Sequence, residues 1–164
     1  MNLCPDSLLN RDLIDLICDN FATFPNQLTV EIIESNYLEN TNVINQHIKK
    51  LNAIGVKVAL DDFGTGYSNL SILSKLNLNI IKLDRTFLER CTTNKGRSVY
   101  SQLVKMFKEL NLTVIAEGVE NADEKDWVNE LKVDVIQDWF YAEALPREPA
   151  HQFAMHWQLD KNVI

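Results

Sequence analysis

The chain has 164 residues, 46% of them hydrophobic, with 5 glycines and 4 prolines, a composition that suffices for one globular domain with a substantial core. Its formal net charge of −7 argues against nonspecific binding to DNA or RNA, which requires a basic surface. No apolar run approaches the roughly 18 residues of a membrane-spanning helix.

Hydrophobic periodicity predicts strands and helices in alternation. Apolar residues at helical spacing predict helices at residues 7–21, 41–54, 68–76, 95–110, 122–131 and 148–158. Apolar, largely β-branched runs predict strands at residues 27–33, 56–60, 78–84, 112–116 and 133–137, after a short first segment at 1–4. Repeated strand–helix units indicate a parallel sheet, either doubly wound or most of a barrel. The absence of a glycine-rich first turn favours the barrel.

Two adjacent acids, Asp61 and Asp62, directly follow the strand at 56–60 and precede the loop Phe63-Gly64-Thr65-Gly66. In parallel α/β folds, the carboxyl ends of the strands are where ligands bind. Neighbouring carboxylates are unfavourable unless a positive charge offsets them, and a divalent cation is the usual solution. The alternative is a turn in which the aspartates cap a helix.

Polar side chains recur at or just after nearly every strand. These residues are Asn2, Glu31, Asp61, Asp62, Lys82, Asp84, Glu117, Glu120 and Gln137. The set is rich in oxygen donors, without a suitable histidine or cysteine, which favours Mg²⁺ or Mn²⁺ over zinc. Carboxylates, a lysine and hard cations together are typical of metal-assisted phosphoester hydrolysis. Singly, each has an ordinary alternative: an exposed Glu31, a Lys82 that is solvated or paired with Asp84, a polar strand end at Gln137.

Five segments resemble one family in order and spacing. They are LTVEIIESNY at 28–37, VKVALDDFGTGYSNL at 56–70, IIKLDRTFL at 80–88, VIAEGVE at 114–120 and IQDWFYAEALP at 136–146. Together they resemble the EAL domain of bacterial cyclic di-GMP phosphodiesterases, and residues 2–9 resemble that family's second-strand segment. The resemblance implies a TIM-like (β/α) barrel that hydrolyses cyclic di-GMP to pGpG with two Mg²⁺ or Mn²⁺ ions.

By position, the resemblance also implies roles for individual residues. The implied metal ligands, with Asp61 bridging both ions, are Asn2, Glu31, Asp61 and Asp62. Lys82 would orient the attacking water or stabilise charge on the phosphate, and Glu117 would act at the metal–water site as base or orienting group. Gln137 would lie near metals and substrate, with Glu120 in support.

A further implied role concerns the loop after Asp62. Glu34 matches the family glutamate that anchors this loop, and Gly64 and Gly66 would let the loop move as metals and substrate bind. Glu34 has the wrong alternation to share a face with Glu31.

The sequence also departs from the family pattern. The family's first strand, whose Glu-Ala-Leu motif supplies a metal ligand, is not found ahead of residue 2, so we expect residues 1–164 to form a single EAL-like domain that lacks the first strand and helix of the barrel. Unpaired strand edges would then favour a homodimer or a domain swap. Asp138 and Glu143 stand where the family has glycine and commonly a basic residue, which predicts weak or absent activity. The alternative is a degenerate module that binds cyclic di-GMP or a protein partner without catalysis.

The cysteines bear on the cellular compartment. Cys4, Cys18 and Cys91 form an odd set without metal-ligand spacing, which is typical of reduced thiols in the cytoplasm. The N-terminal residues show no basic segment followed by an apolar stretch, so no export signal is expected. We therefore expect a cytoplasmic protein.

Overall fold

The computed structural model describes residues 1–24, 26–33, 40–65, 70–137 and 145–161. Six parallel strands form one sheet in the order β1-β2-β3-β4-β5-β6. The strands are β1 (Asn2–Leu3), β2 (Thr29–Ile33), β3 (Lys57–Phe63), β4 (Ile80–Leu83), β5 (Thr113–Glu117) and β6 (Val135–Gln137). Each strand is added beside the preceding one, which is the order of a (β/α) barrel and excludes the reversed order of a doubly wound sheet.

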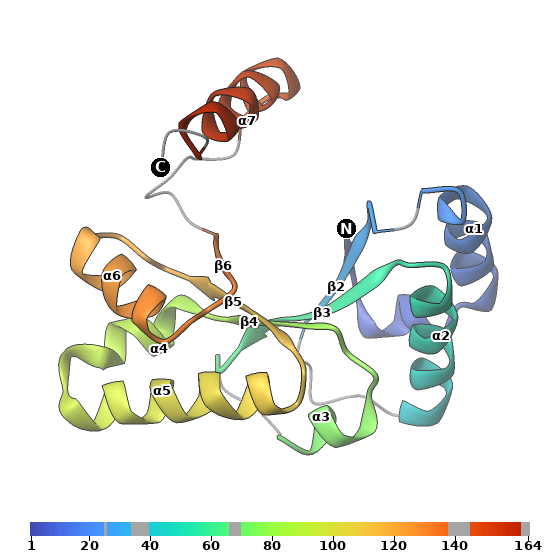
Figure 1. Cartoon of the computed structure of the whole chain (residues 1–164). Coiled ribbons are helices and arrows are strands. Elements are labelled where there is room, and N and C mark those ends of the chain that lie inside the picture. The colour runs from blue at the N-terminus through green and yellow to red at the C-terminus, as the bar shows by residue number, and fades with distance from the viewer. Residues whose placement is uncertain (25, 34–39, 66–69, 138–144, 162–164) are drawn as a thin grey trace.

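Helices connect the strands, as the periodicity predicts. They are α1 (Arg11–Phe21), α2 (Thr41–Ala53), α3 (Ser71–Lys75), α4 (Arg85–Glu89), α5 (Asn94–Glu109), α6 (Ala122–Glu130) and α7 (Arg147–Lys161), with short 3₁₀ turns η1 (Pro5–Leu9) and η2 (Arg90–Thr92). Figure 1 shows α1 and α2 side by side near β2 and β3, and α4, α5 and α6 beside β4 to β6. None of the described helices is long and apolar enough to cross a membrane.

The strand expected at 56–60 extends to Phe63, so Asp61 and Asp62 lie within β3 rather than after it. Two further differences concern the helices. A single helix over 7–21 is wrong: η1 ends at Leu9, and α1 begins only after Asn10, whose side chain accepts a hydrogen bond from the Leu13 N–H at 3.2 Å. The expected elements also omit α4, which begins where the Asp84 carboxylate accepts the Thr86 N–H at 2.9 Å. In both places a capping side chain, Asn10 or Asp84, starts a helix at a position that the apolar pattern alone does not indicate.

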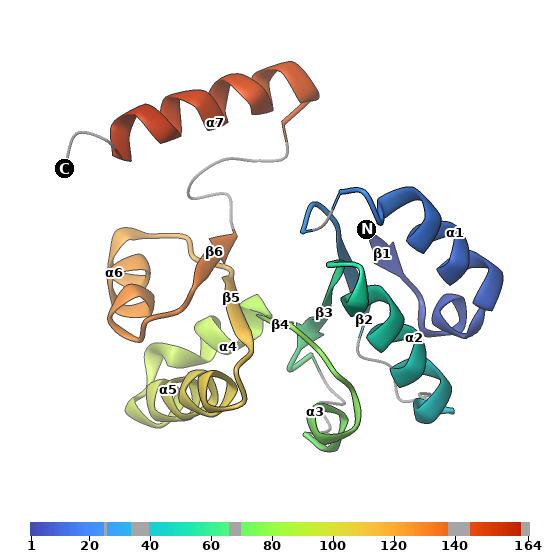
Figure 2. The same cartoon turned by 45° about the vertical axis from the view of Figure 1, so that its right-hand side comes forward.

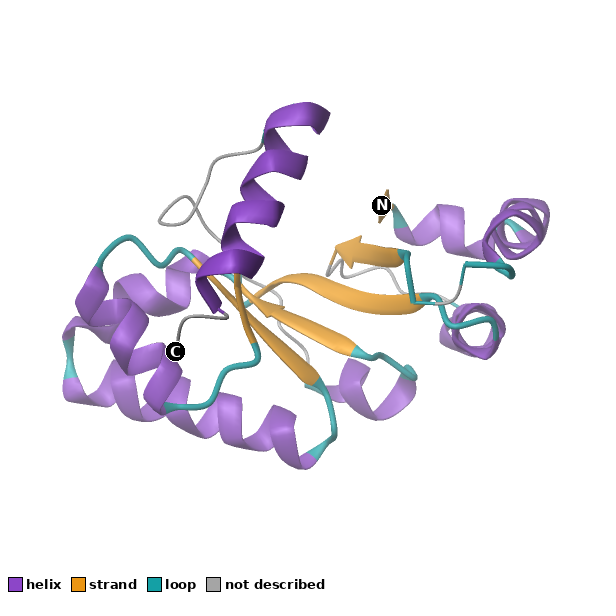
Figure 3. Cartoon of the chain, turned by 45° about the horizontal axis from the view of Figure 1, so that its top comes forward, coloured by secondary structure: helices purple, strands orange, loops and turns teal. Residues whose placement is uncertain are grey.

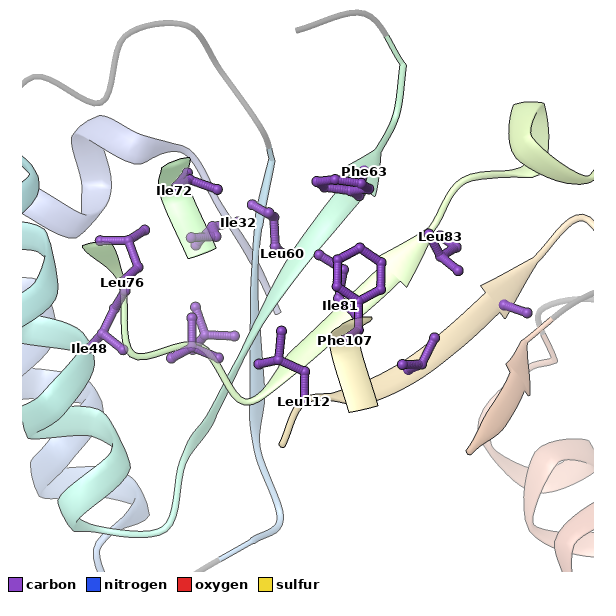
Figure 4. Packing of buried hydrophobic residues seen from close by; sticks show 14 of the residues in the cluster. Ile32, Ile48, Leu60, Phe63, Ile72, Leu76, Ile81, Leu83, Phe107 and Leu112 are labelled. Carbon is purple, nitrogen blue, oxygen red and sulfur yellow. The ribbon is translucent and has the colours of Figure 1, made fainter. Parts of the chain in front are cut away.

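The hydrophobic core lies between one face of the sheet and the helices (Figure 4). On β2, β3 and β4 the strand residues in this core include Val30, Ile32, Leu60, Ile81 and Leu83, each at most 1% exposed. Phe63 packs against Phe107 of α5 with ring centroids 5.3 Å apart. Because side chains alternate along a strand, the residues between these core positions face the other side of the sheet. Glu31 and Lys82 are among them.

The two ends of the chain flank this other side of the sheet. In Figures 1 and 2, α7 lies on the side of the strands opposite α3 and α5. In Figure 3, only the C-terminal end of α7 overlaps one end of the strands, and the rest of the helix projects away from the sheet. The polar residues between the core positions therefore belong to the face that helices α1 to α6 leave uncovered.

Candidate active site

The buried Lys82 ammonium lies at the centre of the site. Its Nζ is 2.7 Å from Asp61 Oδ1, 2.8 Å from Glu117 Oε1 and 3.6 Å from Glu31 Oε1. Lys82 is 4% exposed and is the only buried charged residue among the side chains that the structure describes. Its strand β4 lies between β3 and β5, so one side chain can reach acids on both neighbours. The alternatives of a solvated Lys82 or a pair with Asp84 are wrong, because Asp84 caps α4 instead.

An irregularity in β3 brings two consecutive acids into this site. The pairing of β3 with β4 shifts in register between Leu60 and Phe63, and Asp62 has a left-handed φ of 55°. The Asp62 N–H donates a hydrogen bond to Asp61 Oδ1 at 3.1 Å. One carboxylate oxygen from each of Asp61, Asp62 and Glu117 lies within 4.8 Å of the other two. Three strand-end acids therefore converge beside one lysine.

Burial and charge shift the protonation of these groups. Burial by itself would lower the pKa of Lys82, but hydrogen bonds to Asp61 and Glu117 outweigh it and raise that pKa above its ordinary value. Burial, and then the charge of Asp61, raise the pKa of Asp62. Burial also raises the pKa of Glu117, more than the contact with Lys82 lowers it. Lys82 therefore stays an ammonium at neutral pH, whereas Asp62 and Glu117 are easier to protonate than ordinary carboxylates.

The donor set fits a hard divalent cation. Asp61, Asp62 and Glu117 offer only carboxylate oxygens, the ligands that Mg²⁺ and Mn²⁺ prefer. The pKa of Asp62 is raised first by burial and then by the charge of Asp61, and a nearby cation would offset both effects. Glu31 lies close by on β2, and Asn2 on β1 is its register partner. These residues are the ones that would hold metal ions here.

The other expected site residues lie around this cluster. Gln137 on β6 pairs in register with Glu117, and its Nε2 donates to Glu117 Oε1 at 3.4 Å. Glu120 lies beyond β5 and forms an ion pair with Arg85 at 2.7 Å, away from Lys82. Arg85 was not singled out in the sequence, although it stands three residues after Lys82, as Glu120 does after Glu117.

The start of the loop after Asp62 is anchored in two ways. Phe63 is the last residue of β3, is 2% exposed and stacks on Phe87 with centroids 6.1 Å apart, so it belongs to the core. The Thr65 hydroxyl donates to the Asp62 carbonyl at 3.1 Å. Gly64 has a φ of +110°, a conformation that favours glycine. Glu34 and Gly66, and likewise Asp138 and Glu143, lie outside the described residues.

Comparison with known proteins gives the family. The model of the EAL domain matches residues 1–144. The chain belongs to the EAL domain family. The resemblance drawn from the five segments is thereby confirmed, and so is the barrel-type fold.

Three curated proteins are similar in sequence to this chain. The chain is 34% identical over 93% of its length to the signaling protein YkoW of Bacillus subtilis, covering 20% of that protein. It is 41% identical over 74% of its length to the oxygen sensor protein DosP of Escherichia coli, covering 15% of that protein. It is 34% identical over 86% of its length to the cyclic di-GMP phosphodiesterase TpdA of Vibrio parahaemolyticus, covering 25% of that protein. The chain thus spans a quarter or less of these relatives.

Solved EAL structures have the same fold. An EAL domain protein from Listeria monocytogenes superposes with a TM-score of 0.84 at 29% identity, over 93% of this chain and 62% of that one. The Klebsiella pneumoniae BlrP1 complex with manganese and cyclic di-GMP superposes with a TM-score of 0.77 at 28% identity, over 87% of this chain and 38% of that one. That neighbour is a complex with a divalent metal and the cyclic dinucleotide.

Proposed function

We propose that this EAL domain is a metal-dependent phosphodiesterase that opens cyclic di-GMP to linear pGpG. The observation that carries the proposal is the buried Lys82, which lies within 2.8 Å of carboxylates on both neighbouring strands, with Asp62 beside them. Such a combination of fixed positive charge and clustered oxygen donors suits the attack of water on a phosphodiester. The similarity to a relative named a cyclic di-GMP phosphodiesterase supports the choice of substrate.

Two Mg²⁺ or Mn²⁺ ions are the proposed cofactors. The residues that would hold them are Asn2, Glu31, Asp61 and Asp62, with Glu117 adjacent. When bound, such ions polarise a phosphoryl oxygen and acidify bound water. The similarity to BlrP1, solved as a complex with manganese and cyclic di-GMP, supports this choice of metal.

The chain's own residues have separable roles in the proposed reaction. Lys82 cannot accept a proton at neutral pH, because its ion pairs raise its pKa, so it acts as a fixed positive charge beside the phosphate. Glu117, whose pKa is raised by burial, can take the proton of the attacking water. The Gln137 amide, 3.4 Å from Glu117 Oε1, orients that carboxylate. We further propose that Gly64 and Gly66 let the following loop adjust as substrate enters.

The test is hydrolysis by the full chain. Cyclic di-GMP is incubated with the chain and MnCl₂ or MgCl₂, and pGpG is followed by chromatography. Asp61→Asn should lower the rate by about 100-fold or more, because it removes a charge shared by Lys82 and the metal site. The matched control is Asp126→Asn, the same change at an exposed residue of α6, which should leave the rate unchanged.

The same experiment distinguishes the alternative function. Cyclic di-GMP binding without pGpG would identify a non-catalytic EAL module, the function favoured by the departure from the family sequence at Asp138, which follows Gln137 where the family has glycine. If the chain shows no cyclic di-GMP binding and no pGpG, both nucleotide functions are contradicted, and only a module that binds a protein partner remains. Calorimetric titration of cyclic di-GMP, run beside the hydrolysis assay, separates these outcomes.

We also propose that the chain associates with a second copy. Within the described part of the chain, β1 and β6 each pair with a single strand, so each has a free edge that another chain could extend. Light scattering that gives the mass of a monomer would contradict this. Cys4, Cys18 and Cys91 are free thiols, which supports the reducing cytoplasm that we propose as its compartment.

A further inference from the structure

An ion pair joins the two chain segments that leave the candidate site. Arg85 Nη1 lies 2.7 Å from Glu120 Oε1. Arg85 follows Lys82 by three residues on the segment leaving β4, and Glu120 follows Glu117 by three residues on the segment leaving β5. Because β4 and β5 are neighbouring parallel strands, equal steps from them end at the same edge of the sheet. The ion pair therefore links the exits of the two strands that carry Lys82 and Glu117.

Both partners are themselves held in place. The Arg85 Nε donates to Glu89 Oε1 at 2.7 Å, one turn further along α4. The backbone N–H of Glu120 donates to Glu124 Oε2 at 2.9 Å, while the Asn121 side chain accepts the Glu124 N–H at 2.9 Å to begin α6. The ion pair thus connects the first turn of α4 to the start of α6, rather than two mobile side chains.

The backbone directly after Glu117 is packed against the same arginine. Gly118 has a φ of +81°, and a Cβ placed on it would lie 2.5 Å from both Cβ and Cγ of Arg85. The absence of a side chain at Gly118 therefore lets the chain pass against the stem of Arg85. Val119, the next residue, is fully buried. Any displacement of Arg85 would be transmitted to the backbone that carries the Glu117 carboxylate.

We propose that Arg85 is a positioning residue, which acts through Glu120 and Gly118 to hold the Glu117 carboxylate 2.8 Å from Lys82. The role rests on the proposed function, in which Glu117 and Lys82 act on the substrate. The side chains of Arg85 and Glu120 are each 55% exposed, so their ion pair adds little to overall stability. Its effect is expected in the site, where a small misplacement of a catalytic group lowers the rate steeply.

The test compares variants of the full chain at saturating Mn²⁺. Arg85→Gln and Glu120→Gln should each lower kcat for cyclic di-GMP by about 10-fold and change KM by less than about 2-fold. Arg11→Gln is the matched control: it makes the same substitution at the exposed Arg11–Asp15 ion pair of α1, so kcat should not change. Exchange of the charges, Arg85→Glu with Glu120→Arg, should restore most of kcat. This exchange is made in the Glu89→Gln background, because a carboxylate at position 85 would otherwise repel Glu89.

Three outcomes would overturn the role: full kcat in Arg85→Gln, a rise in KM at constant kcat, or no recovery on charge exchange. A second readout is independent of turnover. Mn²⁺ titration without substrate should give a dissociation constant about 5-fold weaker in Arg85→Gln than in the unchanged chain and in Arg11→Gln. If the unchanged chain binds Mn²⁺ but makes no pGpG, the proposed function fails while this comparison still decides whether Arg85 positions Glu117. Equal dissociation constants then overturn the role.

Discussion

The backbone N–H of Asp62 donates to the carboxylate of the residue before it, Asp61, at 3.1 Å. In a regular strand these consecutive side chains would point to opposite faces of the sheet. Here the left-handed Asp62 and the register shift between Leu60 and Phe63 turn both carboxylates toward Glu117. Backbone irregularity at the end of β3 is thus what creates a three-acid cluster from a two-acid motif.

The left-handed conformation predicts different effects for two neutral substitutions of Asp62. Asparagine tolerates positive φ, whereas alanine does not, and both remove the same charge. We expect Asp62→Ala to have a free energy of unfolding about 1 kcal/mol lower than that of Asp62→Asn, measured by urea denaturation in EDTA. Equal stabilities would show that the backbone at Asp62 is not strained.

Removing the Lys82 ammonium should lower the stability of the chain but raise its affinity for metal. Lys82→Met leaves Asp61 and Glu117 without their shared cation, so the metal-free chain should lose about 3 kcal/mol of unfolding free energy at neutral pH. Mn²⁺ affinity should rise, because no ammonium then competes for the same oxygens, while hydrolysis is lost. Urea denaturation and Mn²⁺ titration measure the two effects. Lys49→Met, at an exposed position of α2, is the control and should change stability by less than about 1 kcal/mol.

A weaker affinity for Mn²⁺ in Lys82→Met would contradict this account of the site. It would mean that the lysine organises the carboxylates for metal binding rather than competing with the metal. The control variant separates either result from a general effect of losing one positive charge.

Much of the fold and the membership of the site could be predicted because they follow from periodicity. Ile81 and Leu83 alternate with Lys82, so an apolar face and a polar face are already separate in the sequence. The carboxyl ends of parallel strands lie at one edge of the sheet. The sequence alone therefore predicts that Glu117 and Asp61 lie near each other. Asn121 and Glu124 have the spacing of a capping box and lie at the start of α6, although Glu124 accepts the Glu120 N–H rather than that of Asn121.

Other features depend on geometry that the sequence pattern does not contain. The pairing of Lys82 with acids on β3 and β5, rather than with Asp84, follows from the order of strands in space. The shared direction of Asp61 and Asp62 follows from a bulge that strict alternation excludes. The role of Arg85 depends on how closely Gly118 approaches it, which only the packed backbone shows.

A side chain added at Gly64 should clash with the aromatic core. Its φ is +110°, and a Cβ there would lie 1.9 Å from Cε2 of Phe87, whose ring stacks on Phe63. We expect Gly64→Ala to lower the free energy of unfolding by about 2 kcal/mol, from backbone strain and displacement of Phe87. Thermal denaturation measures the change.

The Phe87 contribution can be isolated with a second substitution. In a Phe87→Ala background the clash is relieved, so Gly64→Ala should destabilise the chain by less than it does alone, leaving the backbone strain. Strict additivity of the two substitutions would contradict a direct contact between the added methyl group and the ring.

Asp134, which lies outside the candidate site, should make a pH-dependent contribution to the free energy of unfolding. Burial alone would raise its pKa, but the hydrogen bonds from Lys108 and from the Val114 N–H, the latter at 2.8 Å, outweigh burial and lower the pKa below the ordinary 3.8. The unfolded chain then takes up a proton more readily than the folded one, so this stability is present above the ordinary pKa and is lost as pH falls through the lowered one. Because the Asp134 side chain is about one-third exposed, we expect Asp134→Asn to lower the free energy of unfolding by only about 1 kcal/mol at pH 7.

The difference between Asp134→Asn and the unchanged chain should shrink as the pH falls below about 4, measured by urea denaturation at a series of pH values. Lys108→Met provides the matched test, since it removes the ion-pair partner and leaves the Val114 N–H in place. In that background Asp134→Asn should have a smaller effect at pH 7, because only the backbone hydrogen bond still favours the carboxylate. An effect of the same size with and without Lys108 would assign the whole contribution of Asp134 to Val114, and therefore to the pairing of β5 with β6 rather than to charge.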